Sequence, residues 1–236
     1  MGEQLIVPRN ANPWHGFRLK KKGAKSTTVK KRGYTDAELV ALFGERPAYH
    51  ALADLMLLGL YTGARLDELC NIRRQDVREA QEGYLLRIEK SKTEAGVRTI
   101  AVCHSLPASV IQRRLDMQRD AAGSLFEELK PGGYDGKLSW AVSKAFGRWR
   151  TKRGLIGETD FHSFRRTVIT LLENRRVTPS HLASFVGHEG GNLAHDVYSD
   201  GPWDATVLAV AKGIHYSEVV EMALSVFASV ESNRPE

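Results

Sequence analysis

The sequence is poor in the features that mark membrane, exported and disulfide-rich proteins. Its longest apolar run, Leu55 to Tyr61, is far shorter than the roughly 20 residues that a bilayer-spanning helix needs. No apolar signal-peptide region follows Met1, which argues against export and for a cytoplasmic location. The two cysteines, Cys70 and Cys103, lie in apolar stretches without C-x-x-C spacing. They are predicted to be reduced core thiols rather than zinc ligands or disulfide partners.

Low-complexity tracts, a phosphate-binding G-x-x-x-x-G-K-[ST] loop and clustered carboxylates for Mg²⁺ are also missing. What remains is the composition of an ordinary globular protein, 42% apolar and 26% charged over 236 residues. That length is enough for one large domain or two small ones with a sizeable core.

Positive charge is concentrated near the N-terminus. The formal charge of the chain is +6, and the segment from Arg18 to Arg32 holds eight Lys and Arg residues and no acid. Without these eight, the chain carries 26 basic and 28 acidic residues. Such a block is typical of a nucleic-acid-binding arm or, more often, of a solvated tail. The candidate DNA-binding residues in it are Lys20, Lys21, Lys22, Lys30, Lys31 and Arg32.

Periodicity predicts a mainly α protein with a small antiparallel sheet, an α+β class. Thr35 to Glu38 forms a capping box, a buried helix covers Tyr49 to Tyr61, and Gly63 ends it. A short helix then begins near Arg65. Strands are expected at 77–79, 84–89 and 98–102, with a hairpin connection through 91–96. Further helices are expected at about 106–121, 137–153, 162–175, 179–186 and 216–231.

The segment from Phe161 to Tyr198 carries the most chemistry. It contains H-x-x-R at His162 and Arg165, then Gly187-His188, then Tyr198 after a glycine-rich spacer. A phenol becomes a nucleophile only if its proton is removed, because its ordinary pKa is about 10. Arginine's planar fork of donors suits a phosphoryl group, so the pattern predicts phosphoryl transfer to tyrosine. Singly, each residue also has an ordinary structural interpretation, such as a surface ion pair for Arg65 with Asp67 or Glu68.

The order R…K…H-x-x-R…G-H…Y resembles the catalytic domain of the tyrosine recombinases, the phage integrase family, over about 34–236. The matching pieces are T-G-A-R-L-D-E-L around Arg65, S-K-T at Lys92, H-S-F-R-R, and V-G-H before the tyrosine. One departure is the spacing from His188 to Tyr198, ten positions, one more than is common in the family. Tyr134 and Tyr216 lie too early and too late to replace Tyr198.

The resemblance implies a role for each matching residue. Tyr198 would attack the scissile phosphate of duplex DNA and give a 3′-phosphotyrosyl intermediate, while Arg65, Arg165 and His188 would bind the non-bridging oxygens. Lys92 would protonate the leaving 5′-oxygen, His162 would accept or position the tyrosine proton, and Glu68 would support Arg65. No cofactor is implied, because the phosphotyrosine conserves the bond energy. The candidate catalytic residues are Arg65, Lys92, His162, Arg165, His188 and Tyr198, with Glu68 supporting.

The resemblance also implies partners and an origin. We expect double-stranded attachment or recombination sites as substrate, a tetramer on DNA, a monomer in free solution, and a phage or mobile element of a prokaryotic cell as source. Residues 1–33 would be a basic segment or interdomain linker, and 34–236 the catalytic domain, with the family's N-terminal core-binding domain absent. An apolar stripe on the last helix, which includes Val220 and Phe227, is expected to pack on its own core or to dock on a neighbouring protomer.

Three other interpretations remain open. The chain is a non-catalytic DNA-binding module of the same fold if Tyr198 is misplaced. It is a metal-dependent hydrolase if His188, Glu189 and His195 bind a metal, although their spacing matches no H-E-x-x-H helix. A type IB topoisomerase would share the chemistry, but the short chain and the S-K-T motif favour recombination.

Overall fold

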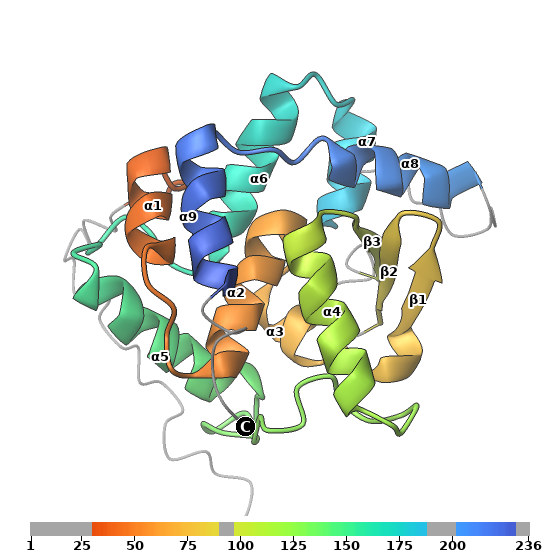
Figure 1. The fold of residues 1–236 in the computed structure, drawn as a ribbon, viewed down its shortest axis with the longest axis horizontal. Helices are drawn as coiled ribbons and strands as arrows, with labels where there is room; N and C mark the ends of the chain where they lie inside the picture. Colours follow the sequence, from red (N-terminus) through yellow and green to blue (C-terminus); the bar gives the residue numbers. More distant parts are fainter. Residues whose placement is uncertain (1–29, 90–96, 188–201, 230–236) are drawn as a thin grey trace, which may run out of the picture.

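A buried helix, α2 (His50–Thr62), runs through the middle of the fold (Figure 1). The sequence of α2 is rich in leucine and alanine, which favour helix, and twelve of its thirteen residues are buried. This computed structural model describes residues 30–89, 97–187 and 202–229. Among them, no helix has the length and apolar character that crossing a bilayer requires. The expected central helix and its capping-box neighbour are both confirmed.

Other helices surround α2 (Figure 1). Helices α3, α4, α5 and α6 each contact α2, and α7 and α8 lie against strand β3 (Arg98–Val102). They pack their apolar faces on one continuous core. Their bounds are α1 (Asp36–Phe43), α3 (Leu66–Cys70), α4 (Ser105–Met117), α5 (Ser139–Lys152), α6 (His162–Asn174), α7 (Pro179–Val186), α8 (Pro202–Lys212) and α9 (Glu218–Ser229), with a 3₁₀ turn η1 (Arg74–Asp76).

The sheet lies at one edge of the helices and has the order β1-β2-β3, antiparallel throughout. Its strands are β1 (Val77–Ala80), β2 (Gly83–Ile88) and β3 (Arg98–Val102), as the alternating pattern predicted. In this register Leu86 pairs with Ile100 and Ile88 pairs with Arg98. Cross-strand partners share a face, so Arg98 lies on the same face as buried aliphatic side chains. The predicted connection through 91–96 lies outside the described residues.

The sequence prediction extended one helix too far and omitted another. Helix α4 ends at Met117 instead of near 121, because Gln118 turns to an extended backbone conformation with ψ 115. Its carbonyl accepts a hydrogen bond from Arg74 at 2.8 Å, and its side chain binds Asp120 and Ser124. Helix α8 was not predicted at all. It contacts β3 and α7, and its residues Val207, Val210 and Ala211 are buried and have helical spacing.

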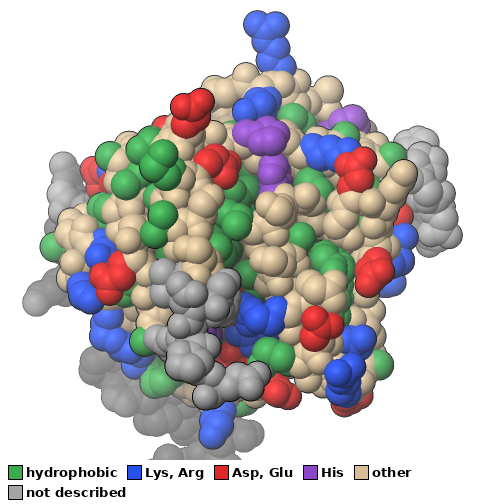
Figure 2. Space-filling view, viewed as in Figure 1, with side chains coloured by type: hydrophobic (Ala, Val, Ile, Leu, Met, Phe, Trp, Pro, Cys, Tyr) green, Lys and Arg blue, Asp and Glu red, His purple; other side chains and the backbone are tan. Residues whose placement is uncertain are grey.

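The last helix, α9, packs on its own chain against α1 and α4. Val220, Leu224 and Phe227 are fully buried, which confirms the expected core packing of this helix. Val219, Met222 and Val226 remain exposed, and apolar side chains gather over α1 and α9 in the space-filling view (Figure 2). An interior role therefore accounts for only one face of α9.

Candidate active site

Arg65 stands at the turn between α2 and α3. Gly63 ends α2 in the left-handed conformation, with φ 62, and a Cβ there would lie 3.3 Å from the Val168 side chain. Glycine meets both constraints. The turn directs Arg65 into the first position before α3, with its side chain one-third exposed. A positively charged fork therefore reaches the surface from a buried, fixed backbone.

Glu68 holds Arg65 from one helical turn further along α3. Its carboxylate accepts the Arg65 backbone N–H at 2.9 Å and the Arg65 Nη1 at 2.6 Å, and it is 3% exposed. Burial alone would raise the pKa of Glu68, but the charges of Arg98 and Arg65 outweigh burial and hold that pKa below its ordinary value. Glu68 is thus an ionised support for Arg65.

Arg98 is a residue of this cluster that the sequence interpretation missed. Its Nη2 donates to Glu68 Oε2 at 3.0 Å, and its Nε donates to the Phe185 carbonyl in the last turn of α7 at 2.9 Å. The signal was present: strand alternation places Arg98 on the apolar face of β3, where a charge requires a partner.

Arg165 enters the cluster from α6 and is almost completely buried, with 1% of the residue exposed. Its guanidinium donates to the Gly63 carbonyl at 3.2 Å and to the Gly187 carbonyl at 3.4 Å. Among the described residues, no carboxylate forms an ion pair with it, and its buried Nε has no acceptor. Burial, with the charges of Arg98 and Arg65, lowers the pKa of Arg165 to about 9, so the group stays charged at neutral pH.

His162 begins α6, one turn before Arg165, and its side chain is exposed. Partial desolvation lowers its pKa below the ordinary 6.5, and the charges of Arg165, Arg166 and Arg65 lower it further. The imidazole is therefore neutral at pH 7 and able to accept a proton.

The remaining predicted catalytic residues, Lys92, His188 and Tyr198, lie outside the described residues, as do Lys20, Lys21, Lys22, Glu189 and His195. The described part of the cluster combines Arg65, Arg98 and Arg165 with the single carboxylate of Glu68. Three positive charges and one negative charge in a mostly desolvated setting suit an anion with several oxygens, such as a phosphodiester. Within the described residues no group of His, Cys, Asp and Glu has the arrangement of a metal site.

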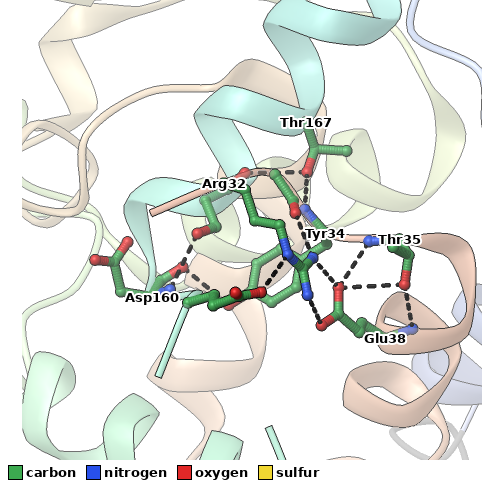
Figure 3. Close-up of polar contacts among 9 residues, drawn as sticks. Arg32, Tyr34, Thr35, Glu38, Asp160 and Thr167 are labelled. Carbon is green, nitrogen blue, oxygen red and sulfur yellow. Dashed lines mark hydrogen bonds and ion pairs between the residues drawn. The ribbon is translucent and has the colours of Figure 1, made fainter. Parts of the chain in front are cut away.

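The described end of the basic segment is anchored to the loop before α6 (Figure 3). Arg32 forms ion pairs of 2.7 Å with Glu38 and Glu158, and Lys31 donates to the Gly157 carbonyl at 2.5 Å. Tyr34 binds the Thr167 hydroxyl and the Asp160 carbonyl, each at 2.8 Å. Lys30 is exposed. The charges of Lys31 and Arg32 therefore face acids and carbonyls of their own chain, unlike that of a free arm.

Solved integrase structures are similar to this chain in fold. The chain is similar to the integrase of mycobacterium phage Brujita, with 14% identity and a TM-score of 0.55 over 82% of this chain and 63% of that one. It is also similar to the integrase of the transposon Tn1549 in complex with transposon right end DNA, with 22% identity and a TM-score of 0.50 over 80% of this chain and 68% of that one. The Tn1549 integrase in complex with a circular intermediate DNA is 19% identical to this chain, with a TM-score of 0.54 over 86% of this chain and 72% of that one.

Identities this low show a shared fold. None of the curated protein sequences matches this chain. The family model described as "Phage integrase family" matches residues 37–200, which is most of the chain and includes every predicted catalytic position. The sequence motifs, the mainly helical fold with its edge sheet, and this match agree: the chain belongs to the phage integrase family of tyrosine recombinases.

Proposed function

We propose that this protein is a site-specific recombinase that cleaves and rejoins duplex DNA through a 3′-phosphotyrosyl intermediate. The observation that supports this most strongly is that Arg65 and Arg165, 100 positions apart in sequence, lie in one partly buried cluster. Arg165 contacts the Gly63 carbonyl, two residues before Arg65. Two guanidiniums so placed can donate to the non-bridging oxygens of one phosphate.

The proposed cleavage step conserves atoms and charge. The Tyr198 oxygen attacks phosphorus, a P–O bond to tyrosine forms, and the bond from phosphorus to the 5′-oxygen breaks. His162 takes the phenol proton, and Lys92 gives a proton to the departing 5′-oxygen. The pentacoordinate state carries two negative charges, which Arg65, Arg165 and His188 stabilise. Rejoining is the reverse, so no nucleotide or other energy source is required.

His162 suits the role of base because its imidazole is neutral at working pH. The arginines that bind the phosphate also lower the pKa of His162. One set of charges would thus both stabilise the phosphorane and keep the base unprotonated. An imidazole at its ordinary pKa would be partly protonated near pH 6.5 and less able to accept.

The proposal extends to domains and partners. Residues 34–236 form the catalytic domain, and 1–33 form a basic segment that leads into it. Its substrate is a double-stranded attachment or recombination site in the cytoplasm of a prokaryotic host. The protein would be a monomer in free solution and a tetramer on this DNA. Lys20, Lys21, Lys22 and Lys30 would contact phosphates, whereas Lys31 and Arg32 must first exchange their acidic or carbonyl partners.

The deciding experiment uses a suicide duplex, nicked near the cleavage point, with attachment sequences taken from the flanks of the source element. Wild type and Tyr198→Phe are incubated with it in EDTA and resolved on a denaturing gel. We expect a covalent adduct from wild type and none from Tyr198→Phe. Tyr134→Phe, which removes a fully exposed phenol, is the matched control and should form the adduct normally.

Binding of these duplexes by wild type without an adduct would instead favour the non-catalytic DNA-binding module. The ten-position spacing from His188 to Tyr198 would then be the first suspect. Fusing a core-binding domain to the N-terminus separates the explanations, because it restores cleavage only if a missing DNA clamp was the cause. Activity on DNA that is present without EDTA and lost when EDTA is added would favour the metal-dependent hydrolase.

A further inference from the structure

Arg98 is the point at which three separate parts of the site are joined. It begins β3, its side chain is 5% exposed, and it donates both to Glu68 on α3 and to the Phe185 carbonyl on α7. Glu68 in turn holds Arg65, and two residues after Phe185 the Gly187 carbonyl contacts Arg165. One guanidinium thus spans the supports of both phosphate-binding arginines.

The burial of Arg98 distinguishes it from an ordinary strand arginine. Arg87 on the neighbouring strand β2 points to the opposite face, is 67% exposed and pairs with Glu89 at 3.4 Å. A desolvated guanidinium engaged at two acceptors has little freedom to rotate toward a substrate. Arg98 therefore acts on the site through the groups it holds.

The charge of Arg98 also changes what Glu68 can do. With Arg65 and Glu68 alone, the ion pair at 2.6 Å would leave the pair neutral. Because Arg98 shares the same carboxylate, Arg65, Arg98, Arg165 and Glu68 together carry two positive charges. That value matches the two negative charges that develop on the phosphorane.

We propose that Arg98 is a positioning residue of the phosphate site. It fixes Glu68 and the end of α7, and it offsets the Glu68 charge so that the cluster keeps a net positive charge toward an anion. This inference rests on the proposed function only for its role in DNA cleavage. The anion-binding role belongs to the described residues and is tested separately.

The first arm measures binding of inorganic sulfate at constant ionic strength, from the rise in unfolding temperature of the full chain. We expect Arg98→Gln to weaken sulfate binding about tenfold, because one buried charge near the anion is lost. Arg87→Gln removes the same charge from an exposed position and should bind within about twofold of wild type. The double variant Arg98→Gln/Glu68→Gln restores the net charge and should recover most of the affinity.

Arg98→Lys separates charge from position. It keeps the charge but cannot reproduce the two-acceptor fork, so we expect sulfate affinity near that of wild type. Should Arg98→Gln fail to fold, the Lys variant and the double variant carry the comparison. Equal sulfate affinity of Arg98→Gln and Arg87→Gln would overturn the charge role.

The second arm measures single-turnover adduct formation on the suicide duplex. We expect Arg98→Gln and Arg98→Lys to lower the rate about 10- to 100-fold while DNA affinity stays within about threefold, since positioning acts on the chemical step. A loss of rate that only follows the unfolded fraction would overturn the positioning role. If wild type forms no adduct at all, the proposed recombinase chemistry fails, and the sulfate comparison still decides whether Arg98 tunes an anion site.

Discussion

One arginine-rich cluster surrounds Asp54 within α2, the other lies beyond Gly63 at the end of α2, and the two differ in how their positive charges are paired. On α2, the fully buried Asp54 accepts hydrogen bonds from Arg46 at 3.2 Å, Arg113 at 2.7 Å and Arg114 at 2.8 Å. Arg114 also pairs with Glu128 at 2.7 Å and lies 4.5 Å over the Phe126 ring. In the candidate active site, Arg165 has carbonyl partners and no described carboxylate.

The pKa directions express the same difference. Burial alone would lower the pKa of Arg114, but Asp54 and Glu128 outweigh burial and raise it. Burial lowers the pKa of Arg165, and neighbouring arginines add to the effect. Each arginine of the first cluster pairs with a carboxylate of the protein, and removing one partner would leave buried charge uncompensated. The second holds positive charge that an external anion would neutralise, which is the property of a binding site.

Replacing Arg165 with methionine should give the largest effect on function and almost none on stability. We expect cleavage to fall about 10²–10³-fold, because one donor to the phosphorane is lost. The free energy of unfolding should change by less than about 1 kcal/mol, since relief of a desolvated charge offsets two lost hydrogen bonds to carbonyls. Adduct formation and denaturant unfolding measure the two quantities. A stability loss as large as that of the Arg114 variant would contradict the distinction between the clusters.

Replacing Arg114 with methionine should have the opposite profile. We expect a loss of about 2–4 kcal/mol in the free energy of unfolding, because Asp54 stays buried with fewer partners. The cleavage rate per folded molecule should be unchanged. Arg113→Met is the matched control, because Arg113 is 31% exposed and its removal should cost less. A cleavage defect in folded Arg114→Met would show that the two clusters are coupled.

Much of the frame of the site was predictable from sequence because it depends on local chemistry. A glycine at position 63 indicated where the helix before Arg65 ends. The alternation of apolar and charged residues indicated which side of β2 is buried. The i,i+3 spacing placed His162 and Arg165 on one face of α6. These features need no knowledge of distant residues, and the structure confirms the elements that carry them.

Ion pairs and hydrogen bonds between residues far apart in the chain could not be predicted from the sequence. Nothing near Asp54 in the chain indicates that Arg113 and Arg114, some 60 positions later, would neutralise it. The link from Arg98 to Phe185 likewise depends on how α7 folds back on β3. The end of α4 at Gln118 follows from a tertiary bond to Arg74. By contrast, α8 was missed although Val207, Val210 and Ala211 carried a readable helical stripe.

The protonation of His162 gives a third way to sharpen the contrast, through pH. The pKa of His162 is lowered below 6.5, so the imidazole becomes protonated only at a pH below 6.5. We expect single-turnover cleavage to be flat near pH 7 and to fall as pH drops below 6.5 through that lowered pKa. In His162→Asn the slower rate should lack this acid limb. An acid limb centred above pH 6.5 would contradict the electrostatic effect of the arginines on His162.

The smallest expected effect compares two charges of the basic segment. Lys30 is exposed, whereas Arg32 is engaged by Glu38 and Glu158. Lys30→Gln should weaken binding to non-specific duplex DNA and reduce the salt dependence by about one released counterion, because a phosphate contact is lost. Arg32→Gln should change both less, since DNA must compete with two carboxylates for that guanidinium. Titrations at several salt concentrations measure both slopes. A larger effect of Arg32→Gln would mean that the ion pairs of Arg32 with Glu38 and Glu158 break when DNA binds. Arg32 would then resemble the arginines of the candidate active site rather than those around Asp54.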